Sequence, residues 1–147
     1  MSIMVFTESE TTGLNQAVAL ATENTSGEIR IHITDISSDD PVVDARRVFE
    51  DLGMRKNPAN NGILFYISAK DRKFVLFGDD GINVRVAADF WTKTTGLVLY
   101  KFSRGEYVKG LMTGIELAGR QLARFFPAQR RENNVKRDVV SYGFFKE

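Results

Sequence analysis

The sequence predicts an α/β domain with a central mixed β-sheet and helices packed on both faces. Residues 28–33 alternate between polar and apolar side chains, as a strand with one buried face does. An amphipathic helical pattern follows, and then a continuous apolar run at 62–67, typical of a strand buried on both faces. We expect this strand–helix–strand unit to be a right-handed parallel crossover. A polar turn then leads into 73–77, which predicts an antiparallel hairpin.

Helical patterns occupy most of the remaining chain. The first begins at the capping-box sequence 7–10 and ends near Asn24. The second starts at Asp39-Asp40-Pro41 and stops at Gly53, as acidic caps, first-turn prolines and terminal glycines indicate. Two more helices are predicted, at about 88–101 and 106–126. The last has one long apolar stripe. Its three glycines are Gly110, Gly114 and Gly119, and only close packing would justify their cost of about 1 kcal/mol each.

The length of 147 residues suits one domain. We place that domain at residues 6–127. Residues 128–147 are predicted to be a polar C-terminal tail that ends in an apolar group, with Val139, Val140, Tyr142, Phe144 and Phe145.

Composition narrows the classes of function. The chain has no cysteine, which excludes thiol catalysis and thiolate metal sites. A net charge of +1 gives no reason to expect nucleic acid as a partner. No signal peptide is visible, and no apolar run is long enough to span a membrane. We therefore expect a soluble, cytoplasmic, monomeric protein.

The predicted topology gathers oxygen-bearing side chains at one end of the sheet. Glu28 starts the first strand, Asn61 precedes the second, and Asp79-Asp80 follow the third, while Glu23 leads into the same corner. Carboxylates and amides suit Ca²⁺ or Mg²⁺ rather than zinc. The sequence therefore predicts a hard-cation site here. The alternative is that Asp79-Asp80-Gly81 forms an ordinary turn after the strand, since aspartate and glycine are common turn residues.

Other candidate sites are weaker. The single histidine, His32, lies on the polar face of its strand, and no serine elbow accompanies it for a catalytic triad. Gly78–Gly81 lacks the lysine and the serine or threonine of a phosphate-binding loop. The opposite end of the sheet also carries aspartates, but helix capping explains Asp39 and Asp40.

Several segments, in order along the chain, resemble the TPM-domain family. They are Thr25-Ser26-Gly27-Glu28-Ile29-Arg30, Asn61-Gly62-Ile63-Leu64-Phe65-Tyr66-Ile67, Asp71-Arg72-Lys73-Phe74 and Phe77-Gly78-Asp79-Asp80-Gly81-Ile82. Within the family the chain is most similar to the short, soluble bacterial branch. The resemblance implies an α/β sandwich and marks Glu28 and Asp79, the residues that the topology also brings together. It further implies divalent-cation binding or acid-phosphatase activity.

Three functions follow as expectations. The favoured one is a binding or accessory module for Ca²⁺ or Mg²⁺ that has an unidentified protein partner. The alternative is a metal-dependent acid phosphatase acting on phosphate monoesters, although no catalytic constellation is visible and no basic residue is assigned to the acidic corner. The third is an interaction domain whose basic C-terminal part docks an anionic partner.

Overall fold

The computed structural model describes residues 6–37, 39–128 and 138–143. The described chain forms one α/β unit. Its helices are α1 (Glu8–Ala21), α2 (Pro41–Asp51), α3 (Asp80–Asn83), α4 (Phe90–Ser103) and α5 (Tyr107–Phe125), with a 3-10 turn at Met54–Lys56. Its strands are β1 (Glu28–Thr34), β2 (Gly62–Ser68), β3 (Lys73–Gly78) and β4 (Val140–Gly143).

The predicted pairings of the first three strands are confirmed. β1 and β2 are parallel and in register from Glu28 opposite Gly62 to Thr34 opposite Ser68. β2 and β3 are antiparallel, with Ile63 opposite Gly78 at the open end of the hairpin. The sheet order is β3-β2-β1-β4. The starts of β1 and β2 and the end of β3 therefore lie at one end of the sheet.

β4 is a strand that the sequence pattern did not predict. It lies within the predicted polar tail and runs parallel to β1, with Ile31 opposite Val140. The Ile31 amide also donates to the Val139 carbonyl at 2.9 Å. Four residues give too little alternation for a strand to be recognised by pattern. Phe144 and Phe145 of the same apolar group lie outside the described residues.

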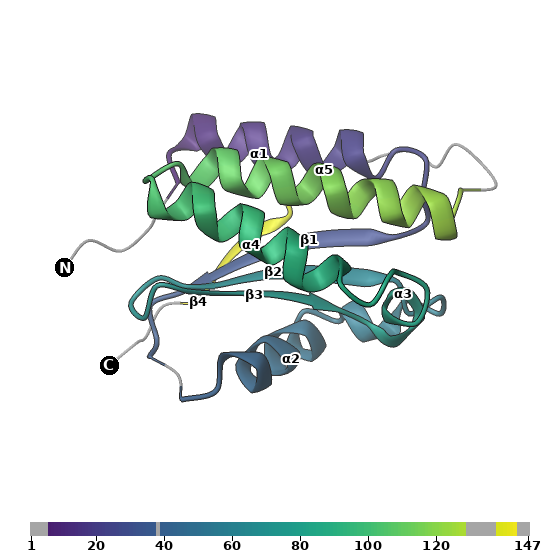
Figure 1. Ribbon diagram of the computed structural model, residues 1–147, viewed down its shortest axis with the longest axis horizontal. Helices are drawn as coiled ribbons and strands as arrows, with labels where there is room; N and C mark the ends of the chain where they lie inside the picture. Colours follow the sequence, from purple (N-terminus) through teal and green to yellow (C-terminus); the bar gives the residue numbers. More distant parts are fainter. Residues whose placement is uncertain (1–5, 38, 129–137, 144–147) are drawn as a thin grey trace.

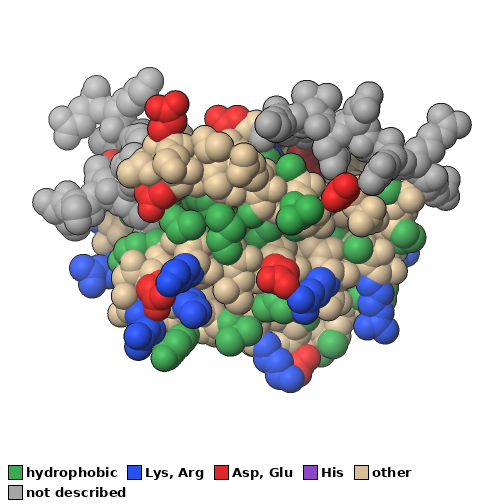
Figure 2. Space-filling view, turned by 90° about the horizontal axis from the view of Figure 1, so that it is seen from above, with side chains coloured by type: hydrophobic (Ala, Val, Ile, Leu, Met, Phe, Trp, Pro, Cys, Tyr) green, Lys and Arg blue, Asp and Glu red, His purple; other side chains and the backbone are tan. Residues whose placement is uncertain are grey.

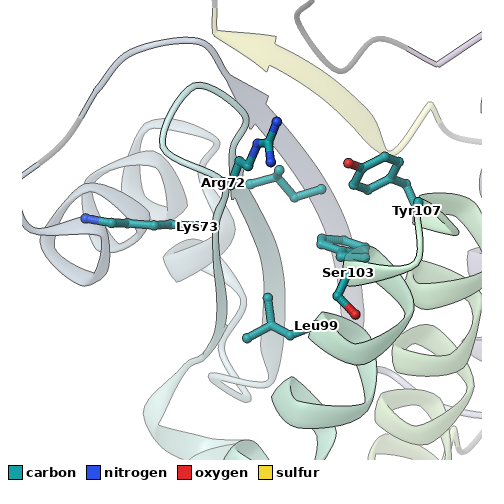
Figure 3. A pocket seen from close by; sticks show the side chains of 8 residues that line it. Arg72, Lys73, Leu99, Ser103 and Tyr107 are labelled. Carbon is teal, nitrogen blue, oxygen red and sulfur yellow. The ribbon is translucent and has the colours of Figure 1, made fainter.

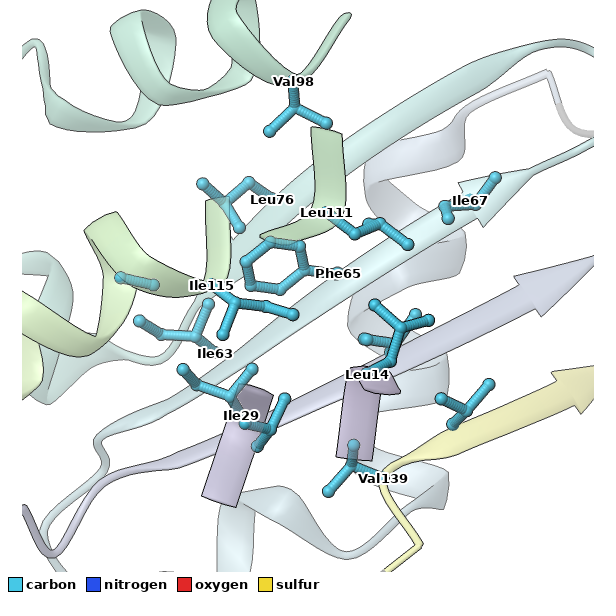
Figure 4. Close-up of a cluster of buried hydrophobic side chains, with 14 of the residues drawn as sticks. Leu14, Ile29, Ile63, Phe65, Ile67, Leu76, Val98, Leu111, Ile115 and Val139 are labelled. Carbon is cyan, nitrogen blue, oxygen red and sulfur yellow. The ribbon is translucent and has the colours of Figure 1, made fainter. Parts of the chain in front are cut away.

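Two layers of helix cover the sheet. α1, α4 and α5 lie on one face and α2 lies on the other (Figure 1). The larger core fills the space under α1 and α5, where Phe65 and Ile63 of β2 meet Leu111 and Ile115 of α5 (Figure 4). All seven residues of β2 are buried, as its continuous apolar run predicted.

The glycines of α5 are explained by close packing, as expected. A Cβ on Gly114 would lie 2.6 Å from the Phe65 ring, and a Cβ on Gly119 would lie 2.7 Å from the Ala21 carbonyl of α1. Contacts this short do not occur in folded proteins. The glycines therefore let α5 approach both the sheet and α1 more closely than alanine would.

The helical face of the molecule carries charges of both signs. Acidic and basic side chains are interspersed there among hydrophobic ones, without a large area of one sign (Figure 2). On α5, Arg120 pairs with Glu116 at 2.5 Å. Arg124, near the end of the same helix, lies over the Phe125 ring, 5.1 Å from its centroid. The remaining basic residues of the C-terminal part, Arg130, Arg131, Lys136 and Arg137, lie outside the described residues. Among the described helices, none combines the length and apolarity needed to cross a membrane.

Candidate functional site

The end of the sheet where β1 and β2 begin holds a cluster of polar side chains around Asp79. This aspartate follows β3 directly, and its amide donates to the Gly62 carbonyl at 3.0 Å. A simple turn was the alternative expectation for Asp79-Asp80-Gly81. Instead Asp79 is the N-cap of the short helix α3. Its side chain accepts from the Asp80 amide at 2.8 Å, the kind of bond that satisfies a free donor at a helix start.

Asp79 is buried, with 1% of its surface exposed. Its Oδ1 atom accepts from the Asp80 amide and from Arg55. Its Oδ2 atom is buried and has no hydrogen-bond partner within the described parts of the chain. An unpaired buried carboxylate oxygen is costly, since it loses water and gains nothing in return. Such an atom indicates either a missing partner or a functional group.

Arg55 supplies the positive charge that the sequence analysis did not assign to this corner. Its Nη1 lies 3.1 Å from Asp79 Oδ1, and its Nε lies 3.3 Å from Glu50. The guanidinium also lies over the Phe49 ring, 5.6 Å from the centroid. Its side chain is 40% exposed, so it is the solvent-exposed partner of the buried Asp79.

Asn61 is also fully buried, and its amide group is held at both ends. Its Oδ1 accepts from Asn57 Nδ2 at 2.6 Å, and its Nδ2 donates to Ser26 Oγ at 3.1 Å. The hydrogen bonds join the loop before β2 to the loop before β1. Asn61 was predicted as a ligand and stays a predicted one, since each end of its amide group makes one of two possible hydrogen bonds; the two bonds that it makes also position the two loops.

The remaining predicted ligands are more dispersed. Asp80 is exposed at the start of α3, and Glu28 is half-buried opposite Gly62 in the β1–β2 register. Glu23 is half-buried in the turn after α1. Within residues 6–37, 39–128 and 138–143, no three acidic or histidine side chains are grouped closely enough to form a metal cage. The structure thus brings Asp79, Asn61 and Arg55 together, without a ring of carboxylates.

His32 lies on the opposite, polar face of β1, as its position in the alternation predicted. Its Nδ1 is 2.7 Å from Ser141 Oγ on β4, and its ring stacks on Tyr66 with centroids 6.2 Å apart. Burial, and then the positive charge of Arg30, lower the pKa of His32 below its usual 6.5. These contacts join three strands, which is a structural role.

Comparison with known proteins places the chain in a class. The sequence model of the TPM domain matches residues 3–121, most of the chain. The protein therefore belongs to the TPM-domain family, as the ordered segments indicated. No curated protein matches it significantly.

A solved structure gives a more particular relative. The NMR structure of the BA42 protein from the psychrophilic bacterium Bizionia argentinensis is similar over 95% of this chain and 97% of that one. The two sequences are 36% identical, and the TM-score is 0.85. The predicted α/β architecture is thus shared with a protein of known structure.

Proposed function

We propose that the Asp79 end of the sheet binds a hydrated divalent cation, Ca²⁺ or Mg²⁺, and that the protein is a binding or accessory module. The observation that carries the proposal is the buried Oδ2 atom of Asp79, which has no partner in the described part of the molecule. A hard cation is a suitable partner for a carboxylate oxygen. Mg²⁺ in particular keeps several waters and is often held by only one or two carboxylates.

The local charge supports a cation. Asp79, Asp80 and Glu50 bring three carboxylates to this corner, against the guanidinium of Arg55 and that of Arg85, which donates to the Gly81 carbonyl at 2.9 Å. The surplus is negative, so the electrostatic potential at the corner favours cations. Glu28 and Glu23, at the same end of the sheet, are the further charges proposed to face the hydrated ion.

Access to Oδ2 depends on Arg55. This side chain is exposed at the corner and binds the other oxygen of the same carboxylate. A cation must therefore approach against the charge of Arg55, or displace its guanidinium toward Glu50. Affinity is expected to be modest for this reason.

Thermal unfolding with Ca²⁺ or Mg²⁺ tests the proposal. A ligand that binds only the folded state stabilises it by about 2.7 kcal/mol at one hundred times its Kd. For a domain of this size that corresponds to a rise of roughly 5–10 °C in Tm. Asp79→Asn removes the ligand charge with little change of shape, so the cation-dependent part of this rise should disappear. Arg55→Gln should instead strengthen binding, because it removes the opposing charge.

Asp89→Asn is the control for charge. Asp89 is exposed before α4 and pairs with Lys93, so the substitution changes net charge equally without removing a proposed ligand or a group bonded to Asp79. Its response to cations should equal that of the unsubstituted protein. If saturating Ca²⁺ and Mg²⁺ leave both the Tm and the amide NMR signals of residues 78–82 unchanged, the cation site does not exist.

A metal-dependent acid phosphatase acting on phosphate monoesters is the second candidate, and Arg55 is the observation that favours it. A guanidinium beside a metal-binding carboxylate is the kind of clamp that phosphoryl oxygens need. Against it, Asp79 is buried and already accepts two hydrogen bonds on Oδ1. We therefore expect no robust turnover of p-nitrophenyl phosphate with Mg²⁺ or Ca²⁺. Turnover that requires metal and is lost in Asp79→Asn would establish the enzyme.

A further inference from the structure

A pocket lies at the other end of the sheet, between the β2–β3 hairpin and the turn that joins α4 to α5. Its volume is about 440 Å³, within the range of small-molecule sites. The lining residues are Ile67, Arg72, Lys73, Leu99, Phe102, Ser103, Gly105 and Tyr107. Ser68 pairs with Lys73 here, whereas Asp79 follows the opposite end of β3. The pocket is therefore separate from the proposed cation site.

The inner wall of the pocket is apolar and held in place by aromatic contacts. Phe102 packs edge-on against Phe74 of β3, with ring centroids 5.6 Å apart. On its other side it contacts Tyr107, with centroids 5.2 Å apart. Ile67, from the buried strand β2, completes this wall. Because these rings belong to three different elements, the apolar surface exists before any ligand arrives.

The rim of the pocket carries polar groups, and one of them is an unpaired cation. Arg72 is exposed in the hairpin and makes no ion pair with any described residue. By contrast Arg104, close by in the α4–α5 turn, is paired with Glu106 at 3.0 Å. Figure 3 shows Lys73 directed away from the pocket, and Tyr107 on the wall across from Arg72. None of the described residues that line the pocket is acidic.

The backbone of Arg72 adds to this picture. Its φ is +53°, a conformation that costs an L-residue about 1 kcal/mol or more and that glycine or asparagine usually occupies in a hairpin. An arginine at this position holds a long cationic side chain beside the pocket, where a glycine would satisfy the turn alone.

We propose that this pocket binds a small organic carboxylate whose apolar body rests on Phe102, Leu99 and Ile67 and whose carboxylate is bound by Arg72. A guanidinium matches the two oxygens of a carboxylate with two parallel N–H bonds. The Tyr107 hydroxyl, which has no hydrogen bond to any described residue, can donate to the same group. A purely apolar ligand would leave the Arg72 guanidinium without a counter-charge.

NMR titration of the ¹⁵N-labelled protein with 4-phenylbutyrate tests this assignment. Saturable shifts are expected for amides of residues 72–74 and 99–107, with Kd near millimolar for a ligand of this size. Two other probes test the contributions of the charge and of the apolar body separately. The alcohol 4-phenylbutan-1-ol keeps the apolar body without the charge, and inorganic phosphate keeps a charge without the apolar body. Both should bind at least about tenfold more weakly, as the loss of a charged hydrogen-bond pair or of the buried ring implies.

Neighbouring hairpin residues provide the matched variants. Arg72→Gln should weaken 4-phenylbutyrate binding about tenfold or more, whereas Lys73→Gln removes the same charge one residue away and should leave it unchanged. Leu99→Gln should weaken it through the apolar wall. Asp79→Asn should have no effect, which keeps this test independent of the cation proposal. The assignment is overturned if no saturable shifts occur up to 10-fold the expected Kd, or if either the alcohol or phosphate binds as well as the carboxylate. It is also overturned if Arg72→Gln and Lys73→Gln behave alike.

Discussion

Two glycine-to-alanine substitutions should change stability in opposite directions. Gly81 lies in α3 directly against the loop before β2. A Cβ there would be 2.3 Å from the Ala59 carbonyl oxygen and 2.5 Å from that of Asn60. Both obstacles are backbone atoms, so they cannot rotate away as a side chain can. Gly96 lies in the middle of α4, and a Cβ there would meet nothing within 4 Å.

The expected magnitudes follow from these contacts. Gly96→Ala should stabilise the folded protein by about 1 kcal/mol, because alanine restricts the unfolded backbone more than glycine does and its Cβ meets no steric obstacle in the helix. For Gly81→Ala the loop and α3 must move apart, and overpacking of this kind costs about 1–3 kcal/mol. At this domain size each kcal/mol corresponds to roughly 2–4 °C in Tm. Gly96→Ala should therefore raise Tm by about 2–4 °C, and Gly81→Ala should lower it by roughly 2–12 °C.

Thermal unfolding followed by far-UV circular dichroism measures both variants under the same conditions, and urea titration gives the corresponding free energies of unfolding. A Gly81→Ala protein as stable as the unsubstituted chain would refute the reasoning, because it would mean that the contact between α3 and the loop carries no steric constraint. Equal gains in both variants would show that helix propensity alone governs the two positions.

Three further predictions concern single side chains. His32→Gln should flatten the pH dependence of stability, which Tm measured from pH 5 to 8 will show. The pKa of His32 is lowered in the folded protein, so the unfolded chain binds more protons below about pH 6.5. The stability of the unsubstituted protein therefore falls as the pH drops through that range. Thr25→Val should cost about 1–3 kcal/mol in urea unfolding, because the single proton of the buried hydroxyl is shared between the Phe126 and Leu122 carbonyls, 2.6 and 3.0 Å away. An unchanged midpoint would contradict this. Phe65→Ala should cost about 3–5 kcal/mol by the same assay, since the ring is fully buried between α5 and β3, and a loss below 1 kcal/mol would mean that the core closes over the cavity.

The sequence was sufficient for most of the architecture because the patterns were long or sharply bounded. The continuous run of β2 and the 19-residue helix α5 each had one strong interpretation. β4 was missed, since its four residues follow a polar segment and its pairing with β1 depends on contact across more than one hundred residues. Short strands of this kind are defined by their partner strand and hardly at all by local pattern.

The site was predictable only in part, and for a related reason. Topology brought Asp79 and Asn61 to one end of the sheet, because strand direction follows from the order of elements. Side-chain pairing does not follow from that order. Arg55 lies in a loop with no periodic pattern, and its approach to Asp79 depends on the turn after α2. The only indication in the sequence was that Arg55 lies between Glu50 and the loop before β2. A basic residue in such a position is too common to identify a site.

The position of β4 has a consequence for how the chain is made. The Ile31 amide of β1 donates to the Val139 carbonyl, and β4 then covers the outer side of β1. During synthesis the other described strands emerge from the ribosome before β4. Until then β1 is an open edge rich in isoleucine, which can pair with another nascent chain. A release of the chain before residue 138 would make that exposure permanent. We therefore expect shortened forms to self-associate through β1, while the complete sheet closes this edge with its last four residues.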